Sequence, residues 1–137
     1  MTHVSISIEI EVPAAAAWKI VGGYDNLPQW LDLVQSSTLE DGGRVRRLHA
    51  VGGAVIVEQM LSFDELMCRF SYRHIEAPDP VSDYVAEMQV DAIGDHRCRV
   101  TWASSFNPRG VDENAAVAHV KGIYKVGLAN LKRVLEA

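Results

Sequence analysis

Residues 33–106 contain a succession of short alternating segments separated by even shorter turns, and this feature constrains the fold most. Apolar and polar residues alternate with a period of two, which is typical of strands with one buried face. We predict strands over residues 33–40, 44–51, 54–63, 67–76, 82–92 and 97–106. Brief turns, such as those at Asp41–Gly43 and Gly52–Gly53, join neighbouring strands in antiparallel fashion. The segment is therefore predicted to form an antiparallel meander.

A seventh strand and three helical segments flank this meander in the sequence. Residues 4–12 alternate strictly between aliphatic and polar side chains and predict the first strand. Pro13 suits the first turn of a short helix, AAAAWKIV, and the following YDNLPQWL is expected to form a second short helix or a structured loop. Residues 112–136 predict one long helix. Its apolar stripe consists of Val117, Val120, Tyr124, Leu128, Leu131 and Leu135.

The single long helix has to cover one face of a seven-stranded sheet. A helix is about 10 Å wide and neighbouring strands lie ~4.8 Å apart, so most of a flat sheet would stay uncovered. Twist and bulges allow the sheet to curl around the helix instead. A curled sheet of this kind leaves a hollow, and hollows with apolar walls and a few polar groups are ligand sites. We therefore predict one α+β domain over residues 1–137 with an internal cavity.

Composition argues against several other classes of protein. The formal net charge of −5 offers no basic surface for nucleic acid, and the RVRR cluster at residues 44–47 fits a solvated strand edge. No apolar run approaches the ~20 residues of a membrane span, and the early alternation is unlike a secretory signal. Two cysteines make no disulfide framework, so we expect a reducing, cytoplasmic setting. Nucleotide-binding glycine motifs and a serine-hydrolase elbow are absent from the sequence.

The positions of cysteine and histidine indicate neither a disulfide nor a metal site. Cys68 and Cys98 each begin a predicted strand, and the strand between them would hold them ~9.6 Å apart, beyond the ~7 Å that a disulfide spans. His74 and Glu76 share one face of a strand, but a third ligand of similar spacing is missing. We therefore expect no metal and no other cofactor.

A family resemblance runs through four stretches and covers essentially the whole chain. They are IEVPAAAAWKIVGGYDNLPQWL, VIVEQMLSFDE, FSYRHIEAPDPVSDYVAEMQV and VTWASSFNP. These stretches resemble the START/Bet v 1-like (SRPBCC) superfamily, and within it the bacterial polyketide cyclase/dehydrase and lipid-transport branch. The resemblance implies a helix-grip fold, in which a seven-stranded curved antiparallel sheet wraps around a long C-terminal helix and two short helices follow the first strand. It also implies a cavity between sheet and helix for hydrophobic or aromatic small molecules.

Residues 70–90 carry aromatic, imidazole, carboxylate and phenol groups on their even-numbered positions, an unusual mixture for either a core or a surface. The mixture is explained if these positions face the cavity. By the same parity the last strand contributes two further aromatic residues, and the apolar stripe of the helix contributes one. The predicted aromatic ligand contacts are Tyr72, Tyr84, Trp102, Phe106 and Tyr124.

Glu58 and His74 are the candidate catalytic residues. Glu58 interrupts an apolar strand, where a carboxylate is costly without a partner. A desolvated Glu58 with a raised pKa, or the imidazole of His74, could move protons in enolisation, aldol cyclisation or dehydration, while Tyr72 or Tyr84 binds an enolate oxygen. In the alternative, which we favour on the sequence alone, Glu58 binds a backbone or strand-end donor and His74 sits at the rim.

Three further residues have open roles. Gly127 lies on the apolar side of the long helix, where it either leaves room for a ligand or allows close contact with the sheet. Trp30, with Tyr24 and Leu27, could form a gate across the cavity mouth, although an ordinary helix-to-sheet staple is favoured. His119 falls opposite the apolar stripe, so a solvated side chain is expected.

The sequence thus predicts binding of a small hydrophobic or aromatic molecule, with cyclase/dehydratase-like acid–base chemistry as the reaction class. Two alternatives stay open, because a fold does not determine a function. One is a non-catalytic carrier or sensor of lipids or other small molecules, and the other is a chaperone-assisting interaction module. The oligomeric state is also open, with a homodimer as one option.

Overall fold

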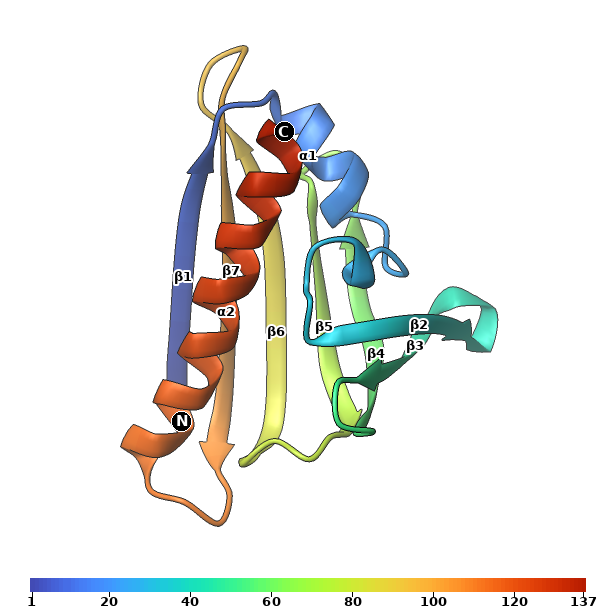
Figure 1. Ribbon diagram of the computed structural model, residues 1–137, viewed down its shortest axis with the longest axis vertical. Coiled ribbons are helices and arrows are strands. Elements are labelled where there is room, and N and C mark those ends of the chain that lie inside the picture. Colours follow the sequence, from blue (N-terminus) through green and yellow to red (C-terminus); the bar gives the residue numbers. More distant parts are fainter.

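The computed structural model describes residues 1–137 and shows a seven-stranded antiparallel sheet (Figure 1). The strands are β1 (Thr2–Ile10), β2 (Val34–Glu40), β3 (Val45–Ala50), β4 (Val55–Asp64), β5 (Arg69–Glu76), β6 (Val81–Ala92) and β7 (Cys98–Pro108). Their spatial order is β1-β7-β6-β5-β4-β3-β2, so consecutive strands from β2 to β7 are neighbours and β1 pairs with β7. All the predicted strands are confirmed, with small shifts at their ends.

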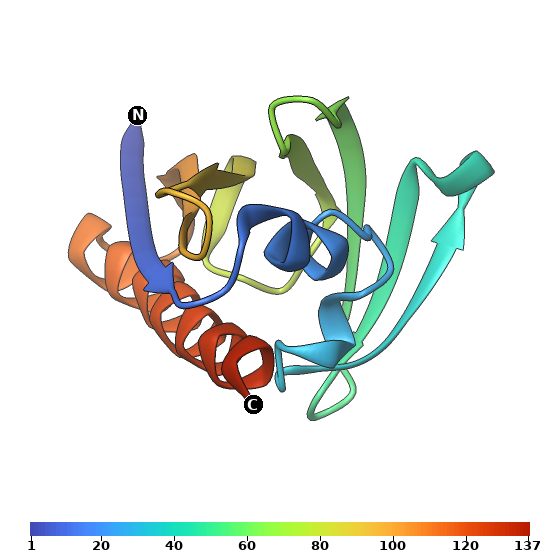
Figure 2. The same ribbon diagram turned by 90° about the horizontal axis from the view of Figure 1, so that it is seen from above.

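Both α-helices and the first 3-10 turn lie on the concave side of this sheet. α1 (Ala14–Val21) and the 3-10 turn η1 (Leu27–Gln29) follow β1, a second 3-10 turn, η2 (Asp41–Gly43), joins β2 to β3, and α2 (Glu113–Glu136) ends the fold. Asp112 caps α2, because its carboxylate accepts the N–H of Ala115 at 2.8 Å. Viewed from above, the sheet curves around α1 and α2, as the covering argument requires (Figure 2). Neither helix combines the length and hydropathy needed to cross a membrane.

Polar contacts fix the C-terminal half of α2 on its neighbours. Lys132 Nζ donates to the carbonyl of Glu9 at 2.9 Å, and Glu136 accepts the backbone N–H of Glu11 at 2.8 Å. The Asn130 amide donates to a backbone carbonyl in the segment that follows η1. These contacts tie the helix to β1 on one side and to the segment after η1 on the other.

A bulge in β6 determines which of its residues face inward. The register between β6 and β7 shifts between Ser82 and Val85, and Asp83 has a positive φ of 52°. Val81 and Tyr84 are both buried as a result, although strict alternation would put them on opposite faces. The bulge therefore adds Val81 to the inward face that the sequence assigned to even-numbered residues.

Gly127 allows close contact between α2 and two tryptophans. A Cβ added at this position would lie 2.8 Å from Leu31 Cδ1 and 3.2 Å from ring atoms of both Trp30 and Trp102. These distances favour the second of the two roles considered for Gly127, close packing rather than space for a ligand beneath it.

Replacement of this glycine gives a first testable prediction. We expect Gly127→Ala to lower the free energy of unfolding by about 1 kcal/mol, because the crowding of the new methyl group outweighs its gain in helix propensity. Gly122 is the matched control, since an added Cβ there meets nothing within 4 Å. Gly122→Ala should raise the free energy of unfolding by ~0.5–1 kcal/mol. Urea denaturation measures both, and equal stabilisation by the two variants would contradict the close contact.

Candidate functional site

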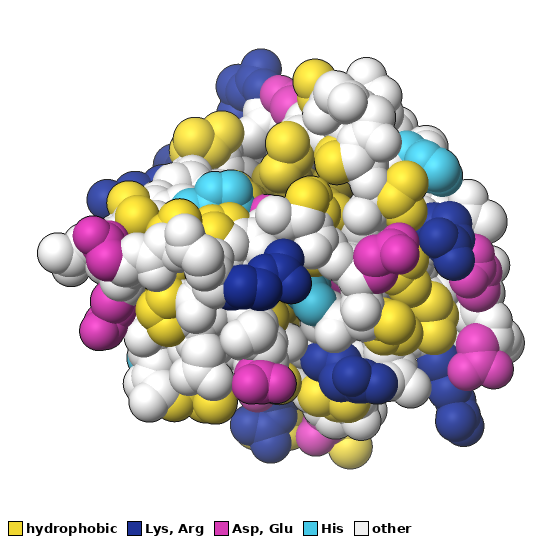
Figure 3. Space-filling model, turned by 90° about the horizontal axis from the view of Figure 1, so that it is seen from below, with side chains coloured by type: hydrophobic (Ala, Val, Ile, Leu, Met, Phe, Trp, Pro, Cys, Tyr) yellow, Lys and Arg dark blue, Asp and Glu magenta, His cyan; other side chains and the backbone are white.

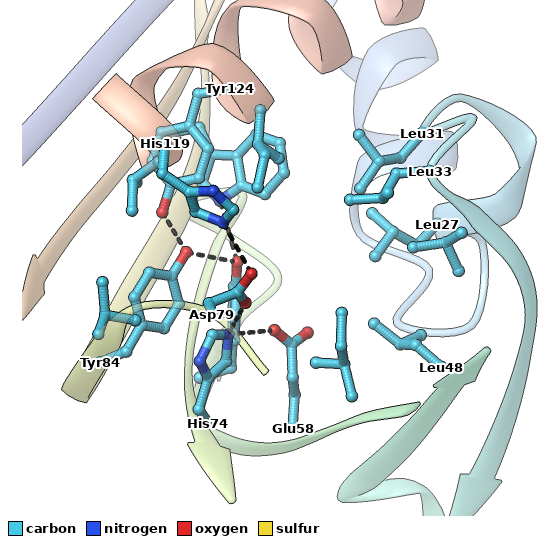
Figure 4. A pocket seen from close by; sticks show the side chains of 17 residues that line it. Leu27, Leu31, Leu33, Leu48, Glu58, His74, Asp79, Tyr84, His119 and Tyr124 are labelled. Atoms are coloured by element: carbon cyan, nitrogen blue, oxygen red, sulfur yellow. Dashed lines mark hydrogen bonds and ion pairs between the residues drawn. The ribbon is translucent and has the colours of Figure 1, made fainter. Parts of the chain in front are cut away.

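A cavity lies between the concave sheet, α2 and the segment around η1 (Figure 4). Its volume is about 50 Å³, which is room for a few water molecules. One side is aliphatic and the other is polar. The aliphatic side includes Leu27, Leu31, Leu33 and Leu48, and the side chains of Ile56 and Ile123 also border the cavity. The polar and aromatic side includes Glu58, His74, Asp79, Tyr84, His119 and Tyr124.

A row of three ionisable side chains crosses neighbouring strands at the polar end. Arg46 of β3 is in register with Glu58 of β4, and Glu58 is in register with His74 of β5. Arg46 Nε donates to Glu58 Oε1 at 2.9 Å, and Arg46 Nη2 lies 2.7 Å from the same oxygen. The second carboxylate oxygen, Oε2, lies 3.2 Å from His74 Nε2. The structure thus brings together the predicted pair and adds an arginine that the sequence analysis did not include.

Arg46 is buried, which corrects the interpretation of the RVRR cluster as a solvated strand edge. Its exposed fraction is 3%, and its Nη1 donates to the carbonyl of Tyr24 at 3.1 Å. The guanidinium carbon lies 4.2 Å from the ring centre of Tyr24 and 4.9 Å from that of Tyr72. The physical reason is parity, since Arg46 shares the inward face of β3 with Leu48 and Ala50.

Glu58 is an ionised carboxylate rather than a neutral acid. Burial alone would raise the pKa of Glu58, but the charge of Arg46 and the contact with His74 outweigh burial and hold that pKa below its usual range. The expectation of a raised Glu58 pKa is therefore wrong, because the sequence analysis considered desolvation without the buried arginine. Glu58 is suited to accept a hydrogen bond from His74 and to orient its ring.

Asp79 links the polar row to α2. It belongs to the loop between β5 and β6, and its two carboxylate oxygens lie 3.9 Å from His74 Nε2 and 2.8 Å from His119 Nε2. The guanidinium of Arg109 donates to the backbone carbonyl of Asp79 at 2.8 Å and holds the loop in place. The cavity mouth therefore contains two imidazoles on either side of one carboxylate.

Asp79 and His119 are site residues that the sequence analysis missed. The His119 side chain is 38% exposed, in partial agreement with the expected solvated residue, but its ring borders the cavity. Asp79 stands between Pro78 and Pro80 in the strand-breaking APDP segment. Two prolines restrict the loop that carries the carboxylate, and this restriction is the one signal that could have drawn attention to it.

Hydroxyl groups of three tyrosines form a connected network beside His74. The Tyr84 hydroxyl is hydrogen bonded to the Tyr124 hydroxyl and lies 3.5 Å from the Tyr72 hydroxyl, which accepts the indole N–H of Trp102 at 3.0 Å. The His74 ring stacks on the Tyr84 ring with 4.0 Å between their centres. Burial raises the pKa of all three tyrosines, so their hydroxyls stay protonated and can donate hydrogen bonds.

Two other predicted ligand contacts, Trp30 and Phe106, stand behind the cavity wall. Trp30 packs edge-to-face against Trp102, with ring centres 5.5 Å apart, and Phe106 packs against Tyr84 at 6.3 Å. Neither side chain borders the cavity itself. Both support the aromatic residues that do, and the packing of Trp30 agrees with the staple rather than the gate.

The loop that carries Asp79 lies at the lower end of the molecule in Figure 1. On this face acidic, basic and hydrophobic side chains are interspersed, and no patch of one charge dominates (Figure 3). The face therefore provides no strong field to attract ligands of one charge.

Comparison with known proteins connects this site to one family. The family described as polyketide cyclase / dehydrase and lipid transport matches residues 1–136. An uncharacterised protein from Bacillus thuringiensis has 33% sequence identity and a TM-score of 0.97, with 99% of this chain and 100% of that chain covered. The protein XoxI from Bacillus cereus has 33% identity and a TM-score of 0.96, with 99% and 96% covered.

More distant structures share the fold. The Zhui aromatase/cyclase from Streptomyces sp. R1128 has 16% identity and a TM-score of 0.74, with 98% of this chain and 92% of that chain covered. No curated protein matches the sequence significantly. The match over nearly the whole chain and the seven-stranded sheet curved around α2 lead to one assignment. The chain belongs to the polyketide cyclase/dehydrase and lipid transport family, with the helix-grip fold of the SRPBCC superfamily.

Proposed function

We propose that the protein binds a small hydrophobic or aromatic molecule with an oxygen substituent in the cavity between the sheet and α2. The observation that carries this proposal is the division of the cavity into two unlike sides. Leucine side chains, among them Leu27 and Leu48, face His74, Asp79 and the tyrosine hydroxyls across the free space (Figure 4). An apolar pocket with a few convergent polar groups is the usual form of a small-molecule site.

The polar side fits a hydroxyl or carbonyl oxygen. The Asp79 carboxylate can accept a hydrogen bond from a ligand hydroxyl. Because the Tyr84 and Tyr124 hydroxyls are hydrogen bonded to each other, one of the two keeps a free proton and can donate it to a ligand carbonyl. The charges of Arg46 and Glu58 cancel within their ion pair. A neutral, oxygenated aromatic ligand therefore matches the site better than a strongly anionic one.

Binding requires the cavity to widen. A volume of about 50 Å³ is smaller than an aromatic ring system, so wall side chains have to move. Leu31 and Leu33 lie between η1 and β2, outside any helix or strand. We expect this segment to shift, because fewer backbone hydrogen bonds hold it than hold the sheet or α2.

Titration with naphthol tests the proposal. We expect calorimetry to show saturable binding of one naphthol molecule per chain. Val120→Trp should abolish binding, because Val120 of α2 borders the cavity and a larger side chain would fill it. Ala129→Trp is the control on an exposed position of the same helix and should bind as the wild type does. Melting temperatures check that both variants fold, and undiminished binding by Val120→Trp would refute the cavity as the site.

Acid–base catalysis by His74 is a second candidate function. The observation that favours it is the contact of His74 Nε2 with one carboxylate, Glu58, and its approach to another, Asp79. Carboxylates that hold an imidazole in one orientation are typical of general bases. The Tyr84 hydroxyl, on the ring stacked against His74, could then stabilise an enolate oxygen. Cyclisation or dehydration of a polyketide is the reaction class that such groups would serve.

A further inference from the structure

A surface groove runs along α2 beside the cavity, and neither candidate function accounts for it. Its volume is about 420 Å³, and the segment after η1 forms one wall. The other wall is a single face of α2, made of His119, Gly122, Ile123, Val126, Gly127 and Asn130. These residues recur at intervals of three and one, as one face of a helix requires. At 1.5 Å per residue, the groove extends about 16 Å along the helix.

The groove and the cavity share a wall. Leu31, Leu33, His119 and Ile123 border both spaces, so these side chains form the shared wall. Two of these side chains have space in which to rotate, since Leu33 is 39% exposed and the His119 side chain is 38% exposed. Rotation of these side chains would join the cavity to the groove and would give the extra room that a ligand in the cavity requires.

The groove is lined by apolar and backbone groups and has charge only near its ends. Asp32, hydrogen bonded by the Asn130 amide at 3.4 Å, lies at one end, and His119 lies at the cavity end. Between them are Val126, which is 69% exposed, and Gly122, which has no side chain to fill the space. An uncharged channel of this kind suits a hydrocarbon chain better than a polar or ionic group.

We propose that the groove holds the alkyl tail of the ligand whose oxygenated head occupies the cavity. The ligand class is then an elongated amphiphile, an oxygenated ring or carbonyl head that bears an alkyl chain. This inference rests on the proposed function, because it requires the head to lie in the cavity. Continuity through the four shared side chains favours one ligand in both spaces over a separate occupant of the groove.

A pair of probes, phenol and para-hexylphenol, tests the inference by calorimetry. We expect para-hexylphenol to bind the wild type at least thirtyfold more tightly than phenol, because each buried methylene group adds about three- to fourfold in affinity. Gly122→Leu places a side chain in the groove. It should lower the affinity for para-hexylphenol at least tenfold and change the affinity for phenol less than twofold. Ala129→Leu, outside the groove on the same helix, should bind both probes as the wild type does.

The outcomes separate the two proposals. If neither phenol nor para-hexylphenol binds the wild type, the proposed function fails. If both bind and Gly122→Leu leaves their ratio unchanged, the cavity holds the ligand and the groove inference is overturned. Sedimentation of the wild type and Gly122→Leu provides one more check. A dimer that the substitution dissociates would assign the groove to a second copy of the chain and would also overturn the inference.

Discussion

Glu58→Gln is expected to lower the free energy of unfolding by about 3–5 kcal/mol, because it leaves the guanidinium of Arg46 buried without a counter-charge. Arg46 is 3% exposed and Glu58 is 5% exposed, so water cannot replace the lost partner. Urea denaturation at neutral pH measures the loss. The double variant Arg46→Met/Glu58→Leu should recover most of the stability, because it removes both charges together.

An exposed ion pair between β2 and β3 provides the matched control. Arg47 Nε lies 2.7 Å from Glu40 Oε2, but both side chains are about two-fifths exposed. Glu40→Gln should leave stability almost unchanged, since exposed pairs contribute little. If Glu40→Gln and Glu58→Gln have the same effect, the buried pair does not stabilise the cavity end as argued.

The lowered pKa of Glu58 also sets the sign of a pH effect. A carboxyl whose pKa is lower in the folded state stabilises the fold at pH values above its unfolded pKa of about 4.3. This stabilisation is lost as the pH falls through the folded pKa, because protonation then removes the partner of Arg46. The wild type should therefore lose stability on acidification below about pH 4.3, and Glu58→Gln should lose less over the same interval.

His74→Ala is the second substitution with a large expected effect. If His74 is the proton-transferring group, the turnover of a linear poly-β-ketone thioester should fall by about 10²–10⁴-fold. Naphthol affinity should change much less, because the aliphatic side of the cavity is untouched. Mass spectrometry of the cyclised product measures turnover, and calorimetry measures affinity.

The control for this substitution is His49→Ala, on the exposed face of β3, which should retain full turnover. Unchanged turnover in His74→Ala would contradict the catalytic role of the imidazole. Naphthol binding without any turnover by the wild type would identify a carrier, and the binding function would stand alone.

Much of the polar row could have been predicted from hairpin symmetry. Arg46 and Glu58 stand at equal distances on either side of Gly52, so a hairpin with the three-residue loop 51–53 places them opposite each other. Composition alone groups Arg46 with Arg44 and Arg47 in a basic cluster, which favours exposure. The register of the hairpin, rather than the charge composition, therefore predicts the Arg46–Glu58 ion pair.

The remaining site residues depend on tertiary structure that alternation does not encode. Asp79 contacts His119 and approaches His74 from the β5–β6 loop, and this loop is held by Arg109, which lies between β7 and α2. The β6 bulge at Asp83 likewise changes which residues face inward, and the alternation of apolar and polar residues in the sequence does not reveal this change. Strand periodicity and the helical stripe thus predicted the fold and the aromatic wall. The residues at the cavity mouth depend on how the loops are placed, which periodicity does not predict.

The most direct test of the account locates a bound ligand by methyl NMR during titration with naphthol. We expect saturable shifts of the methyl groups of Leu48, Ile56 and Ile123, which border the cavity. The methyl groups of Ile75 and Val85, exposed on the outer face of the sheet, should not move. Shifts confined to the outer face, or no saturable shift at the cavity methyl groups, would contradict the claim that the space between the sheet and α2 is the binding site.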